Sequence, residues 1–251
     1  MDNVDITKKR LLDLAKRSYD GGYYLFSDFL DLAGQADLDA VRTLFKNVAY
    51  TTFGGAEGAE RVMVRFGSEE ELGYVEEFPI VCIKCEPKSA KFADKLTHRD
   101  FLGALMNLGI ERSTLGDIAI VDNSGYIFAK RDISEFIITE LTKVKRTDVV
   151  CSITEQIPEG ELYKTERRTV QAVGERVDAV VAKVFSISRD EALSYFKRRL
   201  VFVDGRQMEN NSYIPKPGER VSVRGLGRFI YRGYRTLSKK GKLNIEVDVY
   251  V

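Results

Sequence analysis

The clearest alternation of apolar and polar positions lies between residues 174 and 224. Four valines from Val177 to Val184 recur at i, i+3, i+4 and i+7, which predicts a helix with one buried face. A second apolar stripe runs from Ala192 to Leu200. Ser188, with Glu191 three residues later, has the spacing of a capping box at the start of that helix. This stretch therefore predicts two short helices in succession.

Turn signals follow the two predicted helices. Val201–Val203 is predicted as a short strand, and Asp204 with Gly205 suits the tight turn of a β-hairpin. Pro217-Gly218 marks a further turn before an alternating strand at 220–224. A last strand is expected from the alternation that runs from Leu243 to Val251. The C-terminal third is thus expected to be a helix pair packed on a sheet.

The middle of the chain predicts six elements in the order β-α-β-β-α-β, which is the ferredoxin-like arrangement and also that of the RNA-recognition motif. Tyr126 and Phe128 lie on one face of the third predicted strand, where aromatic rings can stack on bases. Packing in a core is the favoured interpretation, because aromatic residues are common in strands. Strands are expected at 78–85, 117–122, 126–130 and 149–154, and helices at 97–108 and 133–141.

The first 75 residues predict a smaller α+β region. Its glycine-rich loop, residues 54–58, lacks the Lys-Ser/Thr pair of a phosphate-binding loop, so we interpret it as a hairpin connection. The elements expected here are a helix at 6–15, a helical segment that contains Phe26, Phe29, Leu30 and Leu32, a short helix at 39–46, and strands at 48–53 and 61–66.

Charge is segregated along the chain although the net charge of all 251 residues is only +1. Residues 167–242 hold 18 Lys and Arg against 7 Asp and Glu, a net charge of +11, and the remainder holds 21 against 31, a net charge of −10. A basic segment of this kind is the electrostatic footprint of nucleic-acid binding. The acidic remainder limits unspecific association.

The C-terminal pattern resembles the alpha-L RNA-binding domain, the module named for small-subunit ribosomal protein four. The matching residues are Arg176-Val177-Asp178, Ser188-Arg189-Asp190-Glu191-Ala192, Val201 to Arg206, and Pro217-Gly218-Glu219. Two positions depart from the family pattern. Arg199 stands where the family has the glycine that closes the second helix, and Asp204 replaces a turn asparagine. Asp-Gly serves this turn as well as Asn-Gly does, whereas Arg199 leaves the helix exit open.

The segment His98-Arg99-Asp100-Phe101-Leu102-Gly103-Ala104, with Leu108-Gly109-Ile110, Arg112 and Gly116-Asp117-Ile118, is similar to the signature of the YlmH-like proteins. The resemblance implies a bacterial cytoplasmic protein of α+β class with three small domains. These are an acidic N-terminal domain at 1–75, a ferredoxin-like or RNA-recognition-like domain at 76–156, and an alpha-L domain at 166–251 that ends in a β-hairpin. Residues 155–161, with Pro158 and Gly160, are expected to link the last two.

Candidate RNA-binding residues follow from the basic clusters and from the alpha-L resemblance. Arg189 at a helix start, the cluster Lys197-Arg198-Arg199 and Arg206 at the hairpin would contact phosphates, which position a protein with little reading of sequence. Cations and aromatic residues interleave after residue 224, which suits phosphates and stackable bases together. The complete predicted set is Arg176, Lys183, Ser188, Arg189, Lys197, Arg198, Arg199, Asp204, Gly205, Arg206, Arg228, Tyr231, Arg232 and Arg235.

The function predicted from these features is non-enzymatic binding of structured RNA. The family resemblance implies ribosomal RNA or transfer RNA on the ribosome, at the large subunit, with a role in translation or in quality control of stalled large subunits. We expect a monomer without a cofactor. An RNA-modifying enzyme of pseudouridine synthase type is an alternative, with Asp100 or Asp178 as the candidate aspartate. A scaffold protein that uses the acidic N-terminal domain is another.

The three cysteines and the one histidine carry weak signals. Cys82 and Cys85 are three residues apart, and Cys151 and His98 could complete a zinc set. Residues three apart on a strand point to opposite faces, so we expect no metal site and interpret the cysteines as small buried residues with free thiols. An odd number of cysteines favours a reducing cytoplasm. No apolar run reaches the ~20 residues of a membrane span, and no signal peptide is expected.

Overall fold

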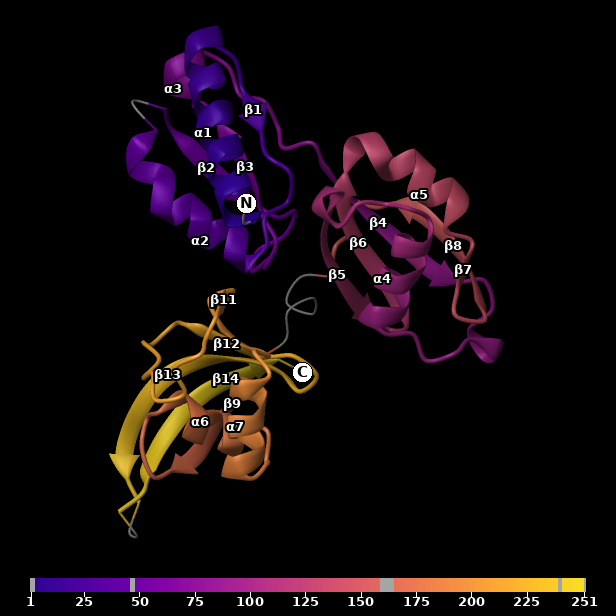
Figure 1. The fold of residues 1–251 in the computed structure, drawn as a ribbon. Helices are drawn as coiled ribbons and strands as arrows, with labels where there is room; N and C mark the ends of the chain where they lie inside the picture. The colour runs from indigo at the N-terminus through magenta and orange to yellow at the C-terminus, as the bar shows by residue number, and fades with distance from the viewer. Residues whose placement is uncertain (1–2, 46–47, 159–164, 239–240, 251) are drawn as a thin grey trace. The chain divides into compact units, whose positions relative to one another are not determined.

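The computed structural model describes residues 3–45, 48–158, 165–238 and 241–250, and within them a mixed α/β fold with three sheets. The chain folds as two compact units, Met1–Tyr163 and Lys164–Val251 (Figure 1). Two of the three sheets lie in the first unit and one lies in the second.

The N-terminal part of the first unit packs helices α1 and α2 on a three-stranded antiparallel sheet of order β1-β3-β2. Leu11, Ala15, Leu38, Val64 and Phe66 are among the residues of its core. The elements are α1 (Asn3–Gly21), β1 (Leu25–Phe26), α2 (Leu32–Val41), the 3-10 helix η1 (Arg42–Leu44), β2 (Tyr50–Phe53), β3 (Met63–Phe66) and α3 (Glu69–Leu72).

The predicted helical segment from Phe26 to Leu32 is wrong. Phe26 belongs to strand β1, which pairs with β3, and Leu30 forms an isolated bridge with Val62. Helix α2 begins only at Leu32, where the Asp31 carboxylate accepts a hydrogen bond from the Gly34 amide at 2.9 Å. The short helix expected at 39–46 is instead the end of α2 followed by η1, and Lys46 lies outside the described residues.

The predicted hairpin around the glycine-rich loop is confirmed, because β2 and β3 pair in antiparallel register from Tyr50↔Phe66 to Phe53↔Met63. Gly55 in that loop has a φ of +97°, and a Cβ placed on it would lie 2.3 Å from Cδ1 of Phe128. A residue with a side chain would therefore clash with the central sheet. The glycine lets the loop backbone lie directly on Phe128.

The central part of the first unit has the predicted order of strands and helices. Its antiparallel sheet has the order β5-β6-β4-β8-β7, in which β7 is an additional short strand. The elements are β4 (Ile80–Pro87), the 3-10 helix η2 (Ala90–Phe92), α4 (His98–Asn107), η3 (Arg112–Thr114), β5 (Leu115–Val121), β6 (Ser124–Lys130), η4 (Arg131–Ile133), α5 (Ser134–Glu140), β7 (Lys143–Val144) and β8 (Thr147–Ile153).

The two faces of the central sheet are both covered, which sets the environment of its aromatic residues. Helices α4 and α5 lie over one face with Phe101, Leu105 and Ile137 in the core. On the other face Tyr126 and Phe128 are 8% and 0% exposed and form a small cluster with Cys82, against which Ala56 and Ile157 pack. The favoured prediction that both aromatic residues pack in a core is confirmed.

The expectation of free thiols is wrong for two of the three cysteines. Cys85 on β4 lies directly opposite Cys151 on β8 in the antiparallel register, and the two form a disulfide. Cys82 remains a buried free thiol on the other face of the sheet, and burial raises its pKa to about 12. Strand alternation therefore separates Cys82 from Cys85 as predicted. The sequence did not predict that β4 and β8 are neighbours, which places Cys85 opposite Cys151.

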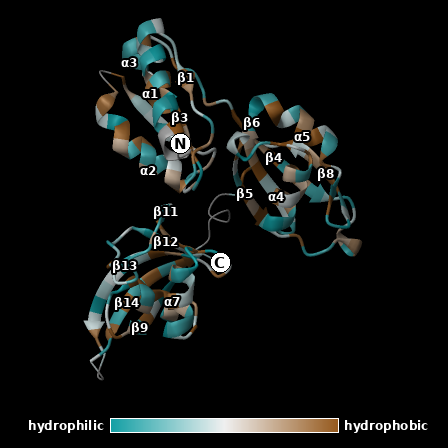
Figure 2. Ribbon diagram, in the orientation of Figure 1, coloured by the Kyte–Doolittle hydropathy of each residue, from teal (hydrophilic) through white to brown (hydrophobic). Residues whose placement is uncertain are grey.

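The second unit is a six-stranded antiparallel sheet of order β11-β10-β12-β13-β14-β9 with α6 and α7 packed on one face (Figure 1). Along its strands hydrophobic positions alternate with hydrophilic ones (Figure 2), and the hydrophobic set faces the helices. The elements are β9 (Thr165–Ala172), α6 (Val177–Val184), α7 (Arg189–Lys197), β10 (Val201–Val203), β11 (Arg206–Gln207), β12 (Arg220–Val223), β13 (Gly227–Leu237) and β14 (Leu243–Tyr250).

Backbone geometry explains both departures from the alpha-L pattern. Asp204 and Gly205 have φ values of 44° and 73°, so the predicted tight turn forms between β10 and β11. Arg199 has a φ of 57° immediately after α7, which is the left-handed conformation that glycine adopts most easily. The helix therefore ends in the usual geometry with an arginine in the glycine position.

Candidate nucleic-acid interface

The Asp178 carboxylate joins the starts of both helices in the second unit. Its side chain is 1% exposed and accepts hydrogen bonds from Arg176 at 3.2 and 2.9 Å, from Arg189 at 3.3 Å and from Asn211 at 3.1 Å. The Ala179 amide donates to the same carboxylate at 2.8 Å. Two predicted RNA-binding residues, Arg176 and Arg189, are thus brought together by a buried acid. Each arginine keeps almost half of its side chain exposed.

The charge state of Asp178 follows from these contacts. Burial alone would raise the pKa of the carboxyl group, since burial penalises the charged form. Hydrogen bonds from Arg176 and Asn211 and the positive charge of Arg189 outweigh burial and lower the pKa below its usual value. The ionised carboxylate therefore holds two guanidinium groups in fixed positions at one end of the helix pair.

The other predicted residues of the helix pair lie near the helix ends. Ser188 caps α7 by accepting a hydrogen bond from the Glu191 amide at 3.0 Å, which is one half of the predicted capping box. At the end of α7, Arg198 lies over the Tyr195 ring at 5.9 Å and Arg199 pairs with Glu209 at 3.3 Å. The exposed lysines here are Lys183 in the last turn of α6 and Lys197 in the last turn of α7.

The hairpin residues have a mainly structural arrangement. The Asp204 carboxylate accepts a hydrogen bond from the Arg220 amide at 2.9 Å, which fixes the turn against β12. Gly205 supplies the second positive φ of that turn, and the exposed Arg206 follows it on β11. Of the three predicted hairpin residues, Arg206 is the one with a cationic side chain.

The predicted residues on β13 divide between the two faces of the sheet. Tyr231 is 1% exposed within the core, and its hydroxyl donates a hydrogen bond to Glu175. The expectation that this ring stacks on a base is therefore wrong, because its position in the strand faces the helices. Arg228 and Arg232 alternate with Tyr231 and lie on the outer face, away from α6 and α7.

Acidic residues on β14 anchor the outer arginines. The Asp248 carboxylate is 8% exposed and accepts from Arg232 at 2.7 Å and from Arg167 at 2.8 and 3.2 Å. Hydrogen bonds from Arg167 lower the pKa of Asp248 against the opposing effect of its burial. Arg235 pairs with Glu246 at 2.9 Å. These pairs keep arginine side chains extended along the outer face of the sheet.

Sequence reasoning missed three residues of the outer face, namely Phe202, Arg224 and Tyr250. The guanidinium of Arg224 lies 4.7 Å from the centroid of the Phe202 ring, and that of Arg228 lies 4.3 Å from the centroid of the Tyr250 ring. The register places Phe202 opposite Ser222 and Ser222 opposite Arg228, so both stacks belong to one row across the sheet. Counting alternate positions along each strand would have revealed Phe202 and Tyr250 as outward residues.

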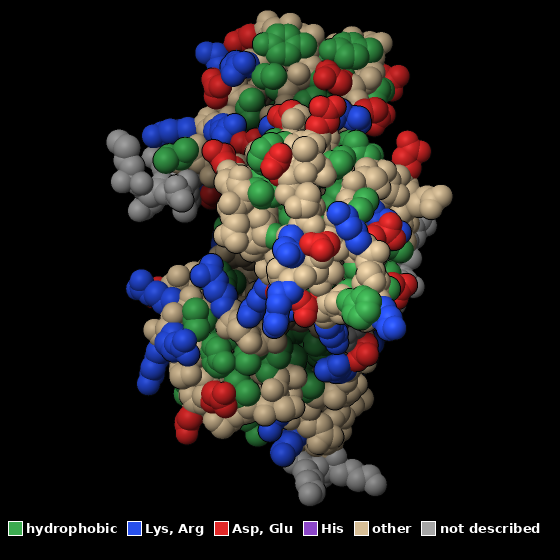
Figure 3. Space-filling model, turned by 90° about the vertical axis from the view of Figure 1, so that its right-hand side faces the viewer, with side chains coloured by type: hydrophobic (Ala, Val, Ile, Leu, Met, Phe, Trp, Pro, Cys, Tyr) green, Lys and Arg blue, Asp and Glu red, His purple; other side chains and the backbone are tan. Residues whose placement is uncertain are grey.

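The predicted site residues therefore do not form one compact site. One group surrounds the helix pair and the other lies on the opposite face of the same sheet. Figure 3 shows blue cationic and red acidic side chains side by side on the face in view. The arrangement can bind an extended polyanion through phosphates, since the guanidinium groups are held by acids rather than left flexible.

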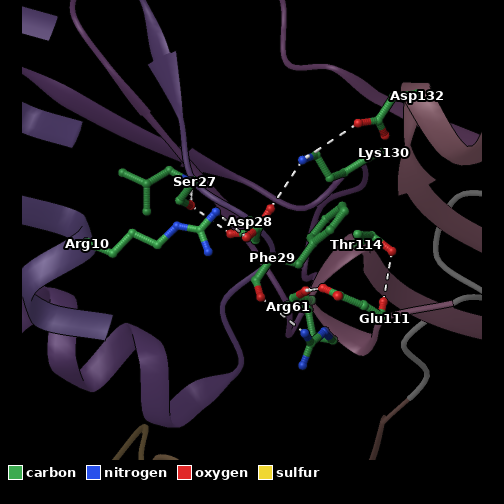
Figure 4. Close-up of polar contacts among 11 residues, drawn as sticks. Arg10, Ser27, Asp28, Phe29, Arg61, Glu111, Thr114, Lys130 and Asp132 are labelled. Atoms are coloured by element: carbon green, nitrogen blue, oxygen red, sulfur yellow. Dashed lines mark hydrogen bonds and ion pairs between the residues drawn. The ribbon is translucent and has the colours of Figure 1, made fainter. Parts of the chain in front are cut away.

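The first unit has a polar network of its own, shown in Figure 4, that joins its two sheets. Asp28 accepts from Arg10 at 2.8 Å and from Lys130 at 3.2 Å. Arg61 donates to the carbonyls of Phe29, Leu115 and Arg112 at 3.1, 2.9 and 3.1 Å. The network thus holds the N-terminal hairpin on the central sheet.

The residues of the YlmH-like signature contribute to the same network. The Asp117 carboxylate, 8% exposed, accepts from the backbone amides of Glu60 and Arg61 at 2.6 and 3.2 Å. Arg112 donates to two carbonyls of β5, and its burial lowers its pKa to about 10. These residues have structural partners, so the signature reports how the first unit is assembled.

The described part of the chain holds no group of three or more His, Cys, Asp or Glu side chains placed to bind a metal ion. Over the same residues, no helix combines the length and the apolar character needed to cross a membrane.

The fold and the charge distribution define a mixed α/β protein whose C-terminal unit carries clustered cations. Residues 75–156 match the family model described as "Putative RNA-binding domain in YlmH". This match covers the central sheet and its helices, and it agrees with the resemblance to the YlmH-like proteins that the sequence motifs indicated.

Two known proteins extend the comparison. The chain is 29% identical over 229 residues to the ribosome-associated protein quality control protein P2 of Bacillus subtilis (strain 168). The aligned residues cover 88% of this chain and 86% of that protein. A solved structure of the cell division protein YlmH from Streptococcus pneumoniae is similar with a TM-score of 0.48 and 20% identity, over 61% of this chain and 93% of that one.

Proposed function

We propose that the protein is a non-enzymatic RNA-binding protein that acts on the ribosome, at the large subunit, with ribosomal RNA or transfer RNA as its ligand. The observation that carries the proposal is the similarity, over 88% of the chain, to a ribosome-associated quality control protein. Clustered cations in the C-terminal unit supply the physical means of binding. A role in the quality control of stalled large subunits, in the cytoplasm and as a monomer, belongs to the same proposal.

The proposal includes a division of labour among three domains, at 1–75, 76–156 and 166–251. The strand order at 76–156 supports a ferredoxin-like domain there, and the helix pair, turn and strands at 166–251 support an alpha-L domain. In this arrangement the C-terminal domain provides most of the affinity through phosphate contacts. Shape then selects the RNA, as is usual for double-stranded RNA.

Two structural roles support the absence of catalysis. The carboxylate of Asp100 accepts from the Thr97 amide at 2.8 Å in a capping box and pairs with Lys145 at 2.9 Å. Asp178 is buried among its arginine partners. Both aspartates considered for a pseudouridine synthase thus serve the fold. Mass spectrometry of ribosomal and transfer RNA, from cells with and without the protein, should show no specific pseudouridine that depends on it.

The experiment that tests RNA binding removes the cations at the end of α7. Replacing Lys197, Arg198 and Arg199 with Ala changes three exposed side chains at the end of that helix. Affinity for ribosomal RNA fragments should fall, and the slope of log K against log salt should flatten by about 0.7 to 0.9 for each lost phosphate contact, hence by about two to three in total.

A charge-matched control tests whether the effect is local. The triple replacement of Lys9, Lys16 and Arg17 with Ala removes three exposed cations of α1 in the first unit. Fluorescence titrations across a range of salt should leave the slope of this control nearly unchanged. If both triple variants lose affinity equally, the binding is diffuse charge attraction and the placement at α7 is wrong.

A further inference from the structure

The segment between β4 and α4 presents a phenylalanine to solvent. Phe92 is 80% exposed, which is the largest value for a large hydrophobic side chain in the described part of the chain. It ends the 3-10 helix η2, and the Lys91 ammonium lies 5.5 Å from the centroid of its ring. A side chain this exposed contributes little to the core. Its position therefore has no explanation in packing.

The segment that carries Phe92 is fixed to the sheet by several hydrogen bonds. Asn123 accepts from the Leu96 amide at 2.7 Å and donates to the Asp94 carbonyl at 2.9 Å. The Asp94 amide donates to the Thr147 hydroxyl at 2.8 Å. These contacts connect the segment to the β5–β6 turn and to the β7–β8 hairpin. The exposed ring is thus presented by an anchored segment, which lowers the entropy lost when a ligand stacks on it.

Cations are frequent on the segment that carries this ring and on the β7–β8 hairpin to which it is bound, although Lys143 and Lys145 pair with Asp148 and Asp100. The segment and the β7–β8 hairpin carry six exposed Lys and Arg side chains, alongside Asp94, Asp100 and Asp148. Lys145 ties the two elements together by donating to the Lys95 carbonyl at 3.2 Å. The six are Lys88, Lys91, Lys95, Lys143, Lys145 and Arg146. We call Phe92 with these six residues the Phe92 patch.

The residues that directly follow Phe92 line a hollow. It measures about 470 Å³ and is lined by residues 93–96 together with Ile120, Asp122 and Asn123. Carboxylate and amide groups of this lining can accept or donate hydrogen bonds at the edge of a base. An exposed aromatic ring, cations on the same and the neighbouring element, and polar groups in a hollow are features by which proteins hold an unpaired nucleotide.

We propose that the Phe92 patch is a second RNA contact, at which Phe92 stacks on an unpaired base while the lysines of the patch contact the flanking phosphates. The inference rests on the proposed RNA-binding function and adds a site in a different unit from the basic helix pair. It also accounts for the buried aromatic face of the central sheet. Tyr126 and Phe128 are covered, so the domain uses a ring on its loops instead.

The test uses the full chain and an RNA hairpin from ribosomal RNA with 2-aminopurine in its unpaired loop. Stacking on Phe92 should change the fluorescence of this base on binding, and Phe92→Ala should abolish that change and weaken binding at least about fivefold. Phe92→Tyr should restore both. Phe136→Ala is the matched control, since Phe136 is another exposed phenylalanine of the same domain, 48% exposed on α5.

Three results would overturn the inference, and they are separable. If Phe92→Ala binds like the unchanged protein while the Lys197, Arg198 and Arg199 variant loses affinity, the second contact is wrong and the proposed function stands. If the unchanged protein binds no RNA at any salt, the proposed function fails with it. If Phe92→Ala loses binding to phosphatidylserine vesicles but not to RNA, the patch serves an anionic membrane surface.

Discussion

Replacing Asp178 with Asn tests whether one buried carboxylate organises the C-terminal helix pair. The substitution keeps the shape of the side chain but removes its charge and turns one acceptor atom into a donor. The new NH₂ group can take the place of either carboxylate oxygen. In one orientation it faces the guanidinium groups of Arg176 and Arg189, and in the other it faces the Ala179 amide, so donor meets donor in both. The loss is therefore electrostatic and not a loss of packing.

The size of the effect follows from the exposure of the partners. Removing one member of a fully buried ion pair costs about 3–5 kcal/mol, because the remaining charge is left without a partner. Here the side chains of Arg176 and Arg189 are 42% and 46% exposed, so water can solvate part of their charge. We expect a loss of about 2–4 kcal/mol in the free energy of unfolding of the second unit.

Hydrogen exchange of amides in α6 and β14 is the suitable assay, because it reports on the second unit separately from the first. The expected loss corresponds to exchange that is roughly 30- to 900-fold faster at neutral pH. Asp190→Asn is the control, an exposed acid in the first turn of α7, where a lost charge costs at most about 1 kcal/mol. Equal effects of the two substitutions would refute the role of Asp178.

The pH dependence gives a second check of the same reasoning. The pKa of Asp178 is lowered in the folded protein, so its contribution to stability is complete above the pKa of the unfolded chain, about 3.9, and is lost as the pH falls through the folded pKa. The difference in stability between the natural protein and Asp178→Asn should therefore shrink below about pH 4. A difference that stays constant down to pH 2 would point to a steric cause.

Two further predictions concern the central sheet. Gly125→Ala should lower the free energy of unfolding by about 1–3 kcal/mol, because a Cβ there would lie 2.6 Å from two ring carbons of Phe101. Gly103→Ala is the control, since a Cβ on Gly103 in α4 meets open space and should not destabilise the protein. Thermal melting followed by circular dichroism compares the two variants. Reduction of the disulfide between Cys85 and Cys151, which closes a loop with a sequence separation of 66, should cost about 4 kcal/mol, and three reactive thiols in the denatured, unreduced protein would contradict the pairing.

Local signals were sufficient to predict most elements from the sequence. The valine stripe from 177 to 184, Ser188 at the start of α7 and the Asp204-Gly205 turn all predict structure within a few residues of themselves, and each is present. The order of elements in the central sheet is predicted for the same reason. Phe26 shows the limit, because its spacing with Phe29 and Leu30 fits a helix while its backbone pairs with β3, a distant strand.

The candidate interface was less predictable because its geometry is tertiary. Asp178 meets Arg189 and Asn211, which lie 11 and 33 residues further along the chain. Sequence reasoning grouped Arg228, Tyr231 and Arg232 as one interleaved cluster. Strand alternation instead sends Tyr231 into the core and the arginines outward, and that alternation is visible in the sequence once the strand is assigned.

Arg199 shows that stability and charge compete at the end of α7. An arginine in the left-handed conformation costs about 1 kcal/mol relative to glycine, and here its side chain reaches only an exposed partner, Glu209. Selection for heat resistance alone would therefore favour glycine at this position. An engineered variant with glycine at this position would gain stability while losing one of the cations at the end of the helix.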